Sequence, residues 1–139
     1  MNDISDREAI TSRKIIEPRL PVAAIGILVM AAGLGARYGL TGFLAKYLGL
    51  GLWAAFVYSL VVLLRPSMRI IHSVALALLV CWSVEFFQLS PVPAYLSSKN
   101  IILRLIFGAN FSVWDLPTYA AGIGLGAGVH SLIRRLSGA

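Results

Sequence analysis

Four long apolar stretches constrain this chain most strongly, because about 17–25 predominantly apolar residues are enough to cross a bilayer as a helix. The first two cover residues 20–36 and 48–64 and contain no charged residue. The third covers residues 70–89 and the fourth about 111–133, each with one acidic residue. In lipid the backbone must satisfy its own hydrogen bonds, so each stretch is predicted to be a transmembrane helix.

The predicted fold is therefore all-α, a polytopic membrane protein with a four-helix transmembrane domain over residues 20–133. Residues 1–19 are predicted to be a tail and residues 134–139 a short C-terminal segment. Short connections predict antiparallel neighbours. Residues 91–110 form a longer connection with its own apolar patch around Arg104. This patch predicts an interfacial or re-entrant segment between helices 3 and 4.

Composition excludes the common soluble classes. The apolar and aromatic set AVILMFWYC makes up 58% of the chain and charged residues 13%, where a soluble domain carries about 25% charged residues. So few polar residues cannot cover a small soluble fold, which rules out a soluble enzyme. A single cysteine rules out an intramolecular disulfide. The formal net charge is +6, but no basic stripe interleaved with aromatics occurs, so we expect no nucleic-acid partner.

Lysines and arginines predict the orientation, because cytoplasmic segments carry more of them. Eight of the twelve lie in residues 1–19, 65–69 and 134–139, and the other four lie on the opposite side. Both termini are therefore predicted to be cytoplasmic. The first stretch is predicted to stay as an uncleaved span, because it is longer than the apolar region of a usual signal peptide.

Two acidic residues are the main candidates for a functional site. Beyond residue 17 the only acids are Glu85 and Asp115, and each falls in a predicted transmembrane helix. Such a placement costs about 2.5–3.5 kcal/mol and marks a functional-site candidate. Helix order brings both acids to the same side of the membrane, which the predicted orientation makes the outer side. Arg37 and Arg104 of the outer connections lie on the same side, as does Trp53, which is predicted to begin the second helix.

The fourth predicted helix has a face of small residues. Asp115, Tyr119, Gly122 and Gly126 follow one another at helical spacing on this face. Small residues let helices approach closely in lipid. We therefore expect this face to be packed, and the Gly122/Gly126 face is a candidate surface for a homo-oligomer or a partner membrane protein.

The same acids also have a structural interpretation. Glu85 with Arg37, or Asp115 with Arg104, would form ion pairs that specify helix register. Asp115 also stands three positions after Ser112, a variant of the capping box at a helix start. The residues alone leave the structural and the functional interpretation open.

Three motifs carry a family resemblance. They are Leu48-Gly49-x-x-Leu52-Trp53-Ala54 with Tyr58, then Val84-Glu85-Phe86-Phe87-Gln88-Leu89, and finally Arg104-Leu105-x-x-Gly108-x-x-Phe111-Ser112-x-x-Asp115-Leu116-x-x-Tyr119-x-x-Gly122. With these motifs, residues 19–132 resemble the family of bacterial membrane proteins called domain of unknown function 2809 (DUF2809). The resemblance implies four spans and no assigned activity.

The shorter pattern E-x-x-Q, then D, then a glycine face, is also similar to VanZ-like membrane proteins. This resemblance implies shared polar positions at Glu85, Gln88, Asp115 and Gly122, and a connection to cell-envelope chemistry. A polar residue, often Asn, follows the Asp by four positions in those proteins. Tyr119 stands there in this chain, so the carry-over is partial. The two resemblances together imply a protein of the bacterial inner (plasma) membrane.

We expect an envelope-associated accessory or binding module with an outward-facing polar pocket for a lipid-linked or small ligand. Its cations suit a phosphate and its acids an amine or hydroxyl. The candidate ligand-binding residues are Glu85, Gln88, Asp115, Arg104, Arg37, Tyr119 and Trp53. Two alternatives stay open, a membrane enzyme whose two carboxyls act as acid and base on a lipid, and a structural or transport-complex subunit without its own site. No metal or cofactor is expected, because His72 and His130 lack a nearby acid or cysteine.

Overall fold

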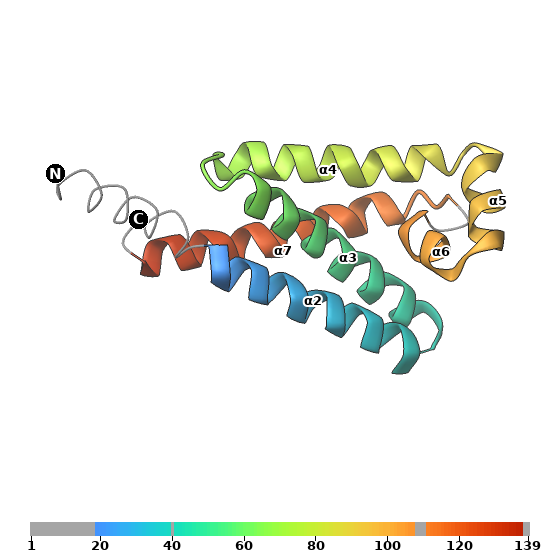
Figure 1. Ribbon diagram of the computed structural model, residues 1–139, viewed down its shortest axis with the longest axis horizontal. Coiled ribbons are helices and arrows are strands. Elements are labelled where there is room, and N and C mark those ends of the chain that lie inside the picture. The colour runs from blue at the N-terminus through green and yellow to red at the C-terminus, as the bar shows by residue number, and fades with distance from the viewer. Residues whose placement is uncertain (1–18, 40, 108–110, 138–139) are drawn as a thin grey trace, which may run out of the picture.

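The computed structural model describes residues 19–39, 41–107 and 111–137, and within them the chain forms six α-helices. Four long helices lie side by side, and two short ones lie at one end of them (Figure 1). The long helices are α2 (Arg19–Gly39), α3 (Gly42–Leu64), α4 (Ile70–Phe87) and α7 (Asp115–Leu136), and the short ones are α5 (Pro91–Lys99) and α6 (Ile101–Phe107). The predicted all-α class is confirmed. Most of the predicted N-terminal tail, residues 1–18, lies outside the described residues.

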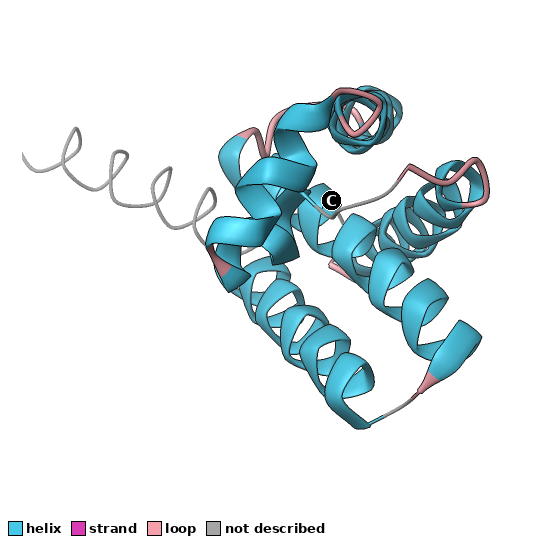
Figure 2. Cartoon of the chain, turned by 90° about the vertical axis from the view of Figure 1, so that its right-hand side faces the viewer, coloured by secondary structure: helices cyan, strands magenta, loops and turns pink. Residues whose placement is uncertain are grey.

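Helix α3 is the centre of the bundle. It packs against α2 on one side and against α7 and α4 on the other, and α4 also packs against α7 (Figures 1 and 2). The long helices alternate in direction along the chain, as their short connections predicted. Because α2 packs chiefly on α3, the bundle stays open between α2 and α7.

Glycines set the closest approaches between helices. A Cβ atom added at Gly122 would overlap the carbonyl oxygen of Gly51, so the backbones of α7 and α3 touch directly. Gly26 and Gly33, two turns apart on α2, bring that helix to α3, where an added Cβ would lie 3.2 and 3.3 Å from side-chain atoms. The glycine face of α7 thus packs at Gly122 against a helix of its own chain.

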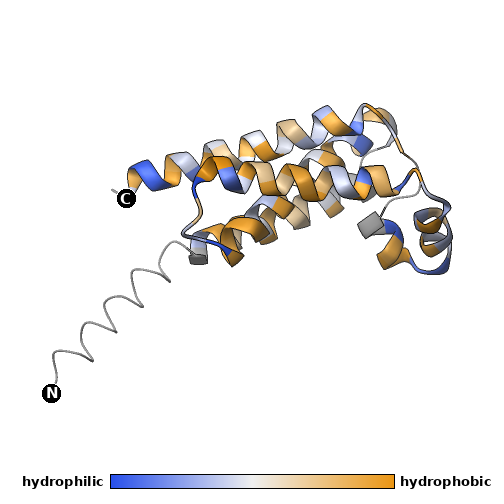
Figure 3. Cartoon of the chain, turned by 90° about the horizontal axis from the view of Figure 1, so that it is seen from above, coloured by the Kyte–Doolittle hydropathy of each residue, from blue (hydrophilic) through white to orange (hydrophobic). Residues whose placement is uncertain are grey.

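Two helices in the described part of the chain, α3 and α4, are long and apolar enough to cross a membrane. Helix α2 contributes a shorter apolar segment, Pro21–Gly35. Large apolar side chains are also exposed on all four long helices. Figure 3 shows many apolar residues along the ribbons of the bundle. Examples on successive long helices are Ile27, Leu64, Leu79 and Leu125.

The core lies where α3, α4 and α7 meet. Residues Ser73, Ala77, Cys81 and Glu85 recur at four-residue intervals along α4 and are all buried, which makes them one stripe facing the core. The core also contains Ala54, Val57, Tyr58, Val61 and Val62 of α3 with Tyr119 and Ile123 of α7. Glu85 is therefore the last member of an otherwise uncharged stripe.

The connection predicted between the first two helices is mostly helical. Helix α2 continues to Gly39 and α3 begins at Gly42, whose φ of +75° is a conformation that glycine adopts easily. This turn replaces the expected connection over residues 37–47. Trp53 therefore lies about three turns inside α3 and not at its start, which corrects the prediction.

Most of the described part of the segment between α4 and α7 is helical as well, where an interfacial or re-entrant segment was predicted. Both of its helices, α5 and α6, lie at the end of the bundle (Figure 1). The side-chain oxygen of Asn100 accepts a hydrogen bond of 2.8 Å from the backbone N–H of Ile102 and so satisfies a free donor at the start of α6.

We expect Gly122→Ala to destabilise the protein by about 3 kcal/mol, the upper end for overpacking, because the new methyl group would overlap the backbone of α3. Gly124 has nothing within 4 Å of an added Cβ, so Gly124→Ala is the matched control and should be neutral or slightly stabilising. Thermal unfolding in one detergent measures both. Equal stability of the two variants would contradict the close contact between α3 and α7.

Candidate functional site

Glu85 is fully buried near the C-terminal end of α4, at 0% exposure. Its Oε1 accepts a hydrogen bond of 2.9 Å from the backbone N–H of Ser112. Its Oε2 accepts one of 3.1 Å from the hydroxyl of Tyr119, in the second turn of α7. A buried carboxyl group needs such partners. One side chain therefore joins α4 both to the segment before α7 and to α7 itself.

Asp115 is the first residue of α7 and is 4% exposed. Its Oδ1 lies 2.9 Å from Nζ of Lys46, in the second turn of α3, as an ion pair without good hydrogen-bond alignment. An acid at this position also interacts favourably with the helix dipole. The Lys46 side chain is 46% exposed, so the pair has one buried and one accessible member.

We call Glu85, Tyr119, Asp115 and Lys46 the polar cluster. Its members come from α3, α4 and α7 at the end of the bundle where α5 and α6 lie. The structure thus brings together three of the predicted site residues, Glu85, Asp115 and Tyr119. It adds Lys46, which the prediction had left out.

The pairing differs from both structural interpretations of the sequence. Asp115 pairs with Lys46, whereas Arg104 is exposed on α6. Ser112 does not cap α7, whose N-cap is Trp114 with no side-chain cap bond. The reason is that Ser112 lies three residues before the helix and its backbone N–H is bound to Glu85.

The other predicted site residues lie as follows. Gln88 is half-buried at the C-terminal cap of α4, where its backbone N–H bonds to the carbonyl oxygens of the preceding turn. Trp53 packs at the edge of the core, with its ring centroid 5.8 Å from that of Phe56. The side chain of Arg37 lies outside the described part of the chain.

A second buried polar pair lies toward the opposite end of the bundle. The hydroxyl of Tyr58 on α3 is 2.8 Å from Nδ1 of His130 on α7, and both residues are buried. One turn further along α7, Arg134 donates a hydrogen bond of 3.3 Å to the carbonyl oxygen of Pro66. This pair was not predicted. Its only sequence signal is that each residue is polar within an apolar stretch.

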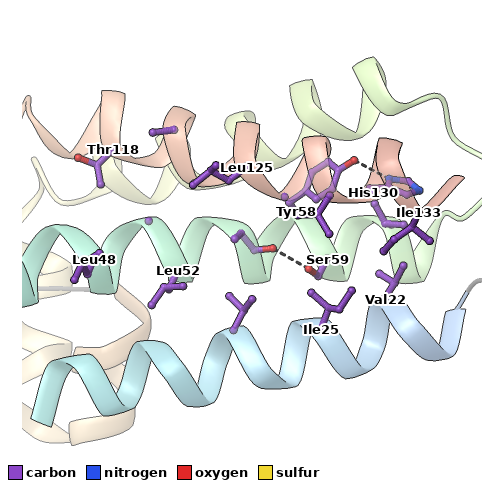
Figure 4. Close-up of a pocket in the computed structure, with 18 of the residues that line it drawn as sticks. Val22, Ile25, Leu48, Leu52, Tyr58, Ser59, Thr118, Leu125, His130 and Ile133 are labelled. Atoms are coloured by element: carbon purple, nitrogen blue, oxygen red, sulfur yellow. Dashed lines mark hydrogen bonds between the residues drawn. The ribbon is translucent and has the colours of Figure 1, made fainter. Parts of the chain in front are cut away.

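An apolar groove of about 350 Å³ lies over α3 between α2 and α7, and we call it the α2/α7 groove (Figure 4). Its volume falls in the range of about 300–1,000 Å³ typical of small-molecule sites. Tyr47 and Thr118 line one end, close in sequence to Lys46 and Asp115, and the Tyr58–His130 pair lines the other. The apolar lining includes Val22, Ile25, Leu48, Leu52, Leu125 and Ile133.

Over residues 39–123, more than half of its length, the chain matches the family described as "Protein of unknown function (DUF2809)". The chain belongs to the DUF2809 family. The matched residues contain all four members of the polar cluster. No curated protein and no solved structure matches the chain. The resemblance to VanZ-like proteins stays a prediction.

We expect Tyr119→Phe to lower the free energy of unfolding by about 1–3 kcal/mol, because the change removes a hydrogen-bond donor from the buried Glu85. Tyr95 on α5 is 64% exposed and offers the matched control. Tyr95→Phe should change stability by less than about 0.5 kcal/mol. Denaturant unfolding in detergent measures both, and a Tyr119→Phe variant as stable as Tyr95→Phe would refute the role of this bond.

Proposed function

We propose that this DUF2809 protein is a membrane-embedded binding module of the cell envelope, and that its polar cluster holds the polar end of a lipid-linked or small ligand. The observation that carries the proposal is the Lys46–Asp115 pair, in which a buried acid meets a half-exposed cation. The pair joins α3, which is long and apolar enough to span a membrane, to the first residue of α7. Ionisable residues in such helices commonly mark binding sites.

The membrane placement rests on several observations. Helices α3 and α4 are long and apolar enough to span, and α2 and α7 lie alongside them with apolar outer faces. We propose that all four cross the bilayer. The arginines at 65, 69, 134 and 135 lie at the end opposite the polar cluster. The positive-inside rule then places those arginines in the bacterial cytoplasm and the polar cluster on the outer side.

Exchange of partners at Lys46 and Asp115 would provide the binding chemistry. A ligand amine or hydroxyl could replace the ammonium group at Asp115, while a ligand phosphate could bind Nζ of Lys46. The flexible stem of a lysine allows its charge to move into water when the pair opens. Opening therefore costs less than breaking a pair in which both charges are buried.

Glu85 has a different part in this proposal. Both of its carboxyl oxygens accept hydrogen bonds from protein groups. We therefore assign it as a positioning residue that fixes α7, and with it Asp115, against α4. A lipid-directed enzyme would need an acid or base within reach of the substrate. The existing partners of Glu85 favour binding over that alternative.

Native mass spectrometry of protein purified in mild detergent tests the proposal. We expect the wild type to retain one defined amphiphile or small molecule from the host membrane. Lys46→Gln and Asp115→Asn should lose it, because each removes one charge of the pair. Lys99→Gln is the matched control, since Lys99 is an exposed lysine on α5, and it should retain the molecule.

Circular dichroism of each variant checks that the helices are intact. Equal retention by Lys46→Gln, Asp115→Asn and the wild type would refute a site at this pair. The absence of any retained molecule from the wild type would count equally against the proposal.

A further inference from the structure

We propose a second site, which binds an anionic phospholipid: one acyl chain lies in the α2/α7 groove, and the headgroup phosphate binds Arg134 at the end of the groove farthest from the polar cluster. This inference shares with the proposed function only the membrane placement of the helices. The second site includes no residue of the polar cluster, so an experiment can refute either proposal without refuting the other.

The dimensions of the groove fit a single hydrocarbon chain. Its lining runs along α7 from Thr118 to Ile133 and along α3 from Tyr47 to Val62, which is about 22 Å at 1.5 Å per residue. The groove is open along one side, and a volume of about 350 Å³ over that length describes a narrow channel. A helix with side chains is about 10 Å across and would lie over the opening, whereas a single hydrocarbon chain can lie within it.

The chemistry of the lining also favours hydrocarbon. Val22, Ile25 and Leu125 form part of the walls (Figure 4). Gly51 also lines the groove, and the open space beside it leaves room for a chain. Apolar cavities do not hold ordered water. The groove opens between α2 and α7, which would face the lipid in a spanning bundle, so an acyl chain can enter it from the side.

Charge places the headgroup at the Arg134 end. Arg134 lies one turn beyond His130, which lines the groove, and its Nη2 donates a hydrogen bond to the carbonyl oxygen of Pro66. A guanidinium group has five N–H donors and binds phosphate in a planar, two-bond arrangement. Arg135, Arg65 and Arg69 lie at the same end of the bundle.

The two acids of the described part of the chain both lie at the opposite end, in the polar cluster. The Arg134 end is therefore positively charged without a described acid to neutralise it, which complements a lipid phosphate. Basic pockets between transmembrane helices on the cytoplasmic side bind anionic headgroups in this way. A surplus of arginines can also reflect orientation alone, and the experiment separates the two.

The test is a native mass spectrometry titration of delipidated full-length protein with phosphatidylglycerol and with phosphatidylcholine of the same acyl chains. We expect one molecule of phosphatidylglycerol to bind per protein, with a higher affinity than phosphatidylcholine. Arg134→Gln should lower the affinity for phosphatidylglycerol about fivefold, which is the effect of one basic residue near a membrane surface. Arg134→Lys keeps the charge and should retain most of the binding, which guards against a merely structural loss.

Two neighbouring positions provide matched controls. Arg135→Gln removes an adjacent exposed arginine and should leave the preference for phosphatidylglycerol largely intact. Ala121 lines the groove and Ala120 does not, although both are exposed on α7. Ala121→Trp should fill the groove and abolish tight binding of both lipids, whereas Ala120→Trp should not.

Three outcomes would overturn the proposal. Equal weakening by Arg134→Gln and Arg135→Gln would indicate diffuse attraction without a site. Equal binding by Ala121→Trp and Ala120→Trp would exclude the groove as the place of the chain. The third outcome is that Lys46→Gln loses phosphatidylglycerol binding while Arg134→Gln keeps it. That result would place the headgroup at the polar cluster, which supports the proposed function and refutes this second site.

Discussion

The carboxyl group of Glu85, which has no solvent exposure, links α4 to two residues that lie 27 and 34 positions further along the chain. It accepts hydrogen bonds from the backbone of Ser112 and from the hydroxyl of Tyr119, and so holds the segment before α7 and α7 itself to α4. Buried polar groups are stable only when partnered. The position of Asp115, between these two donors in sequence, follows from the same contact, and so does the place where it meets Lys46.

Glycine contacts also fix the position of α7. Contact between the backbones of Gly122 and Gly51 sets the distance between α7 and α3, so α7 is fixed from two sides. Association with another chain through Gly122 would compete with this internal contact. Gly124 and Gly128 have open space around them, and a surface for a second copy or a partner would therefore have to include that side of α7.

The sequence was most informative where one physical requirement acts over many residues. The four apolar stretches predicted four long helices because each stretch must either lie in lipid or be buried. The placement of Glu85 and Asp115 at the same end of the bundle followed from helix order alone. The start of α3 was missed because a single glycine turn at Gly42 replaces a longer connection. Lys46 was consequently placed in that connection and not on a helix facing Asp115.

Contacts between residues that are distant in sequence could not be predicted from the sequence. The bond between Tyr58 and His130 joins positions 72 residues apart. Tyr58 belongs to the first family motif, but nothing in that motif indicates His130 as its partner. Ser112 has the spacing of a helix cap, but its backbone N–H bonds to Glu85 instead. Such partners depend on how α3, α4 and α7 pack, which a hydropathy pattern does not specify. The α2/α7 groove arises in the same way, because α2 packs chiefly on α3.

The central claim is that the two ends of the bundle lie on opposite sides of a membrane. Cysteine labelling tests it most directly. Ser67, between α3 and α4, and Ser98 on α5 are exposed at opposite ends. In a Cys81→Ala background, Ser67→Cys should react with a membrane-impermeant maleimide only after the membrane is opened, whereas Ser98→Cys should react in intact spheroplasts. Equal reactivity of the two cysteines in intact spheroplasts would contradict a spanning bundle with its polar cluster on the outer side.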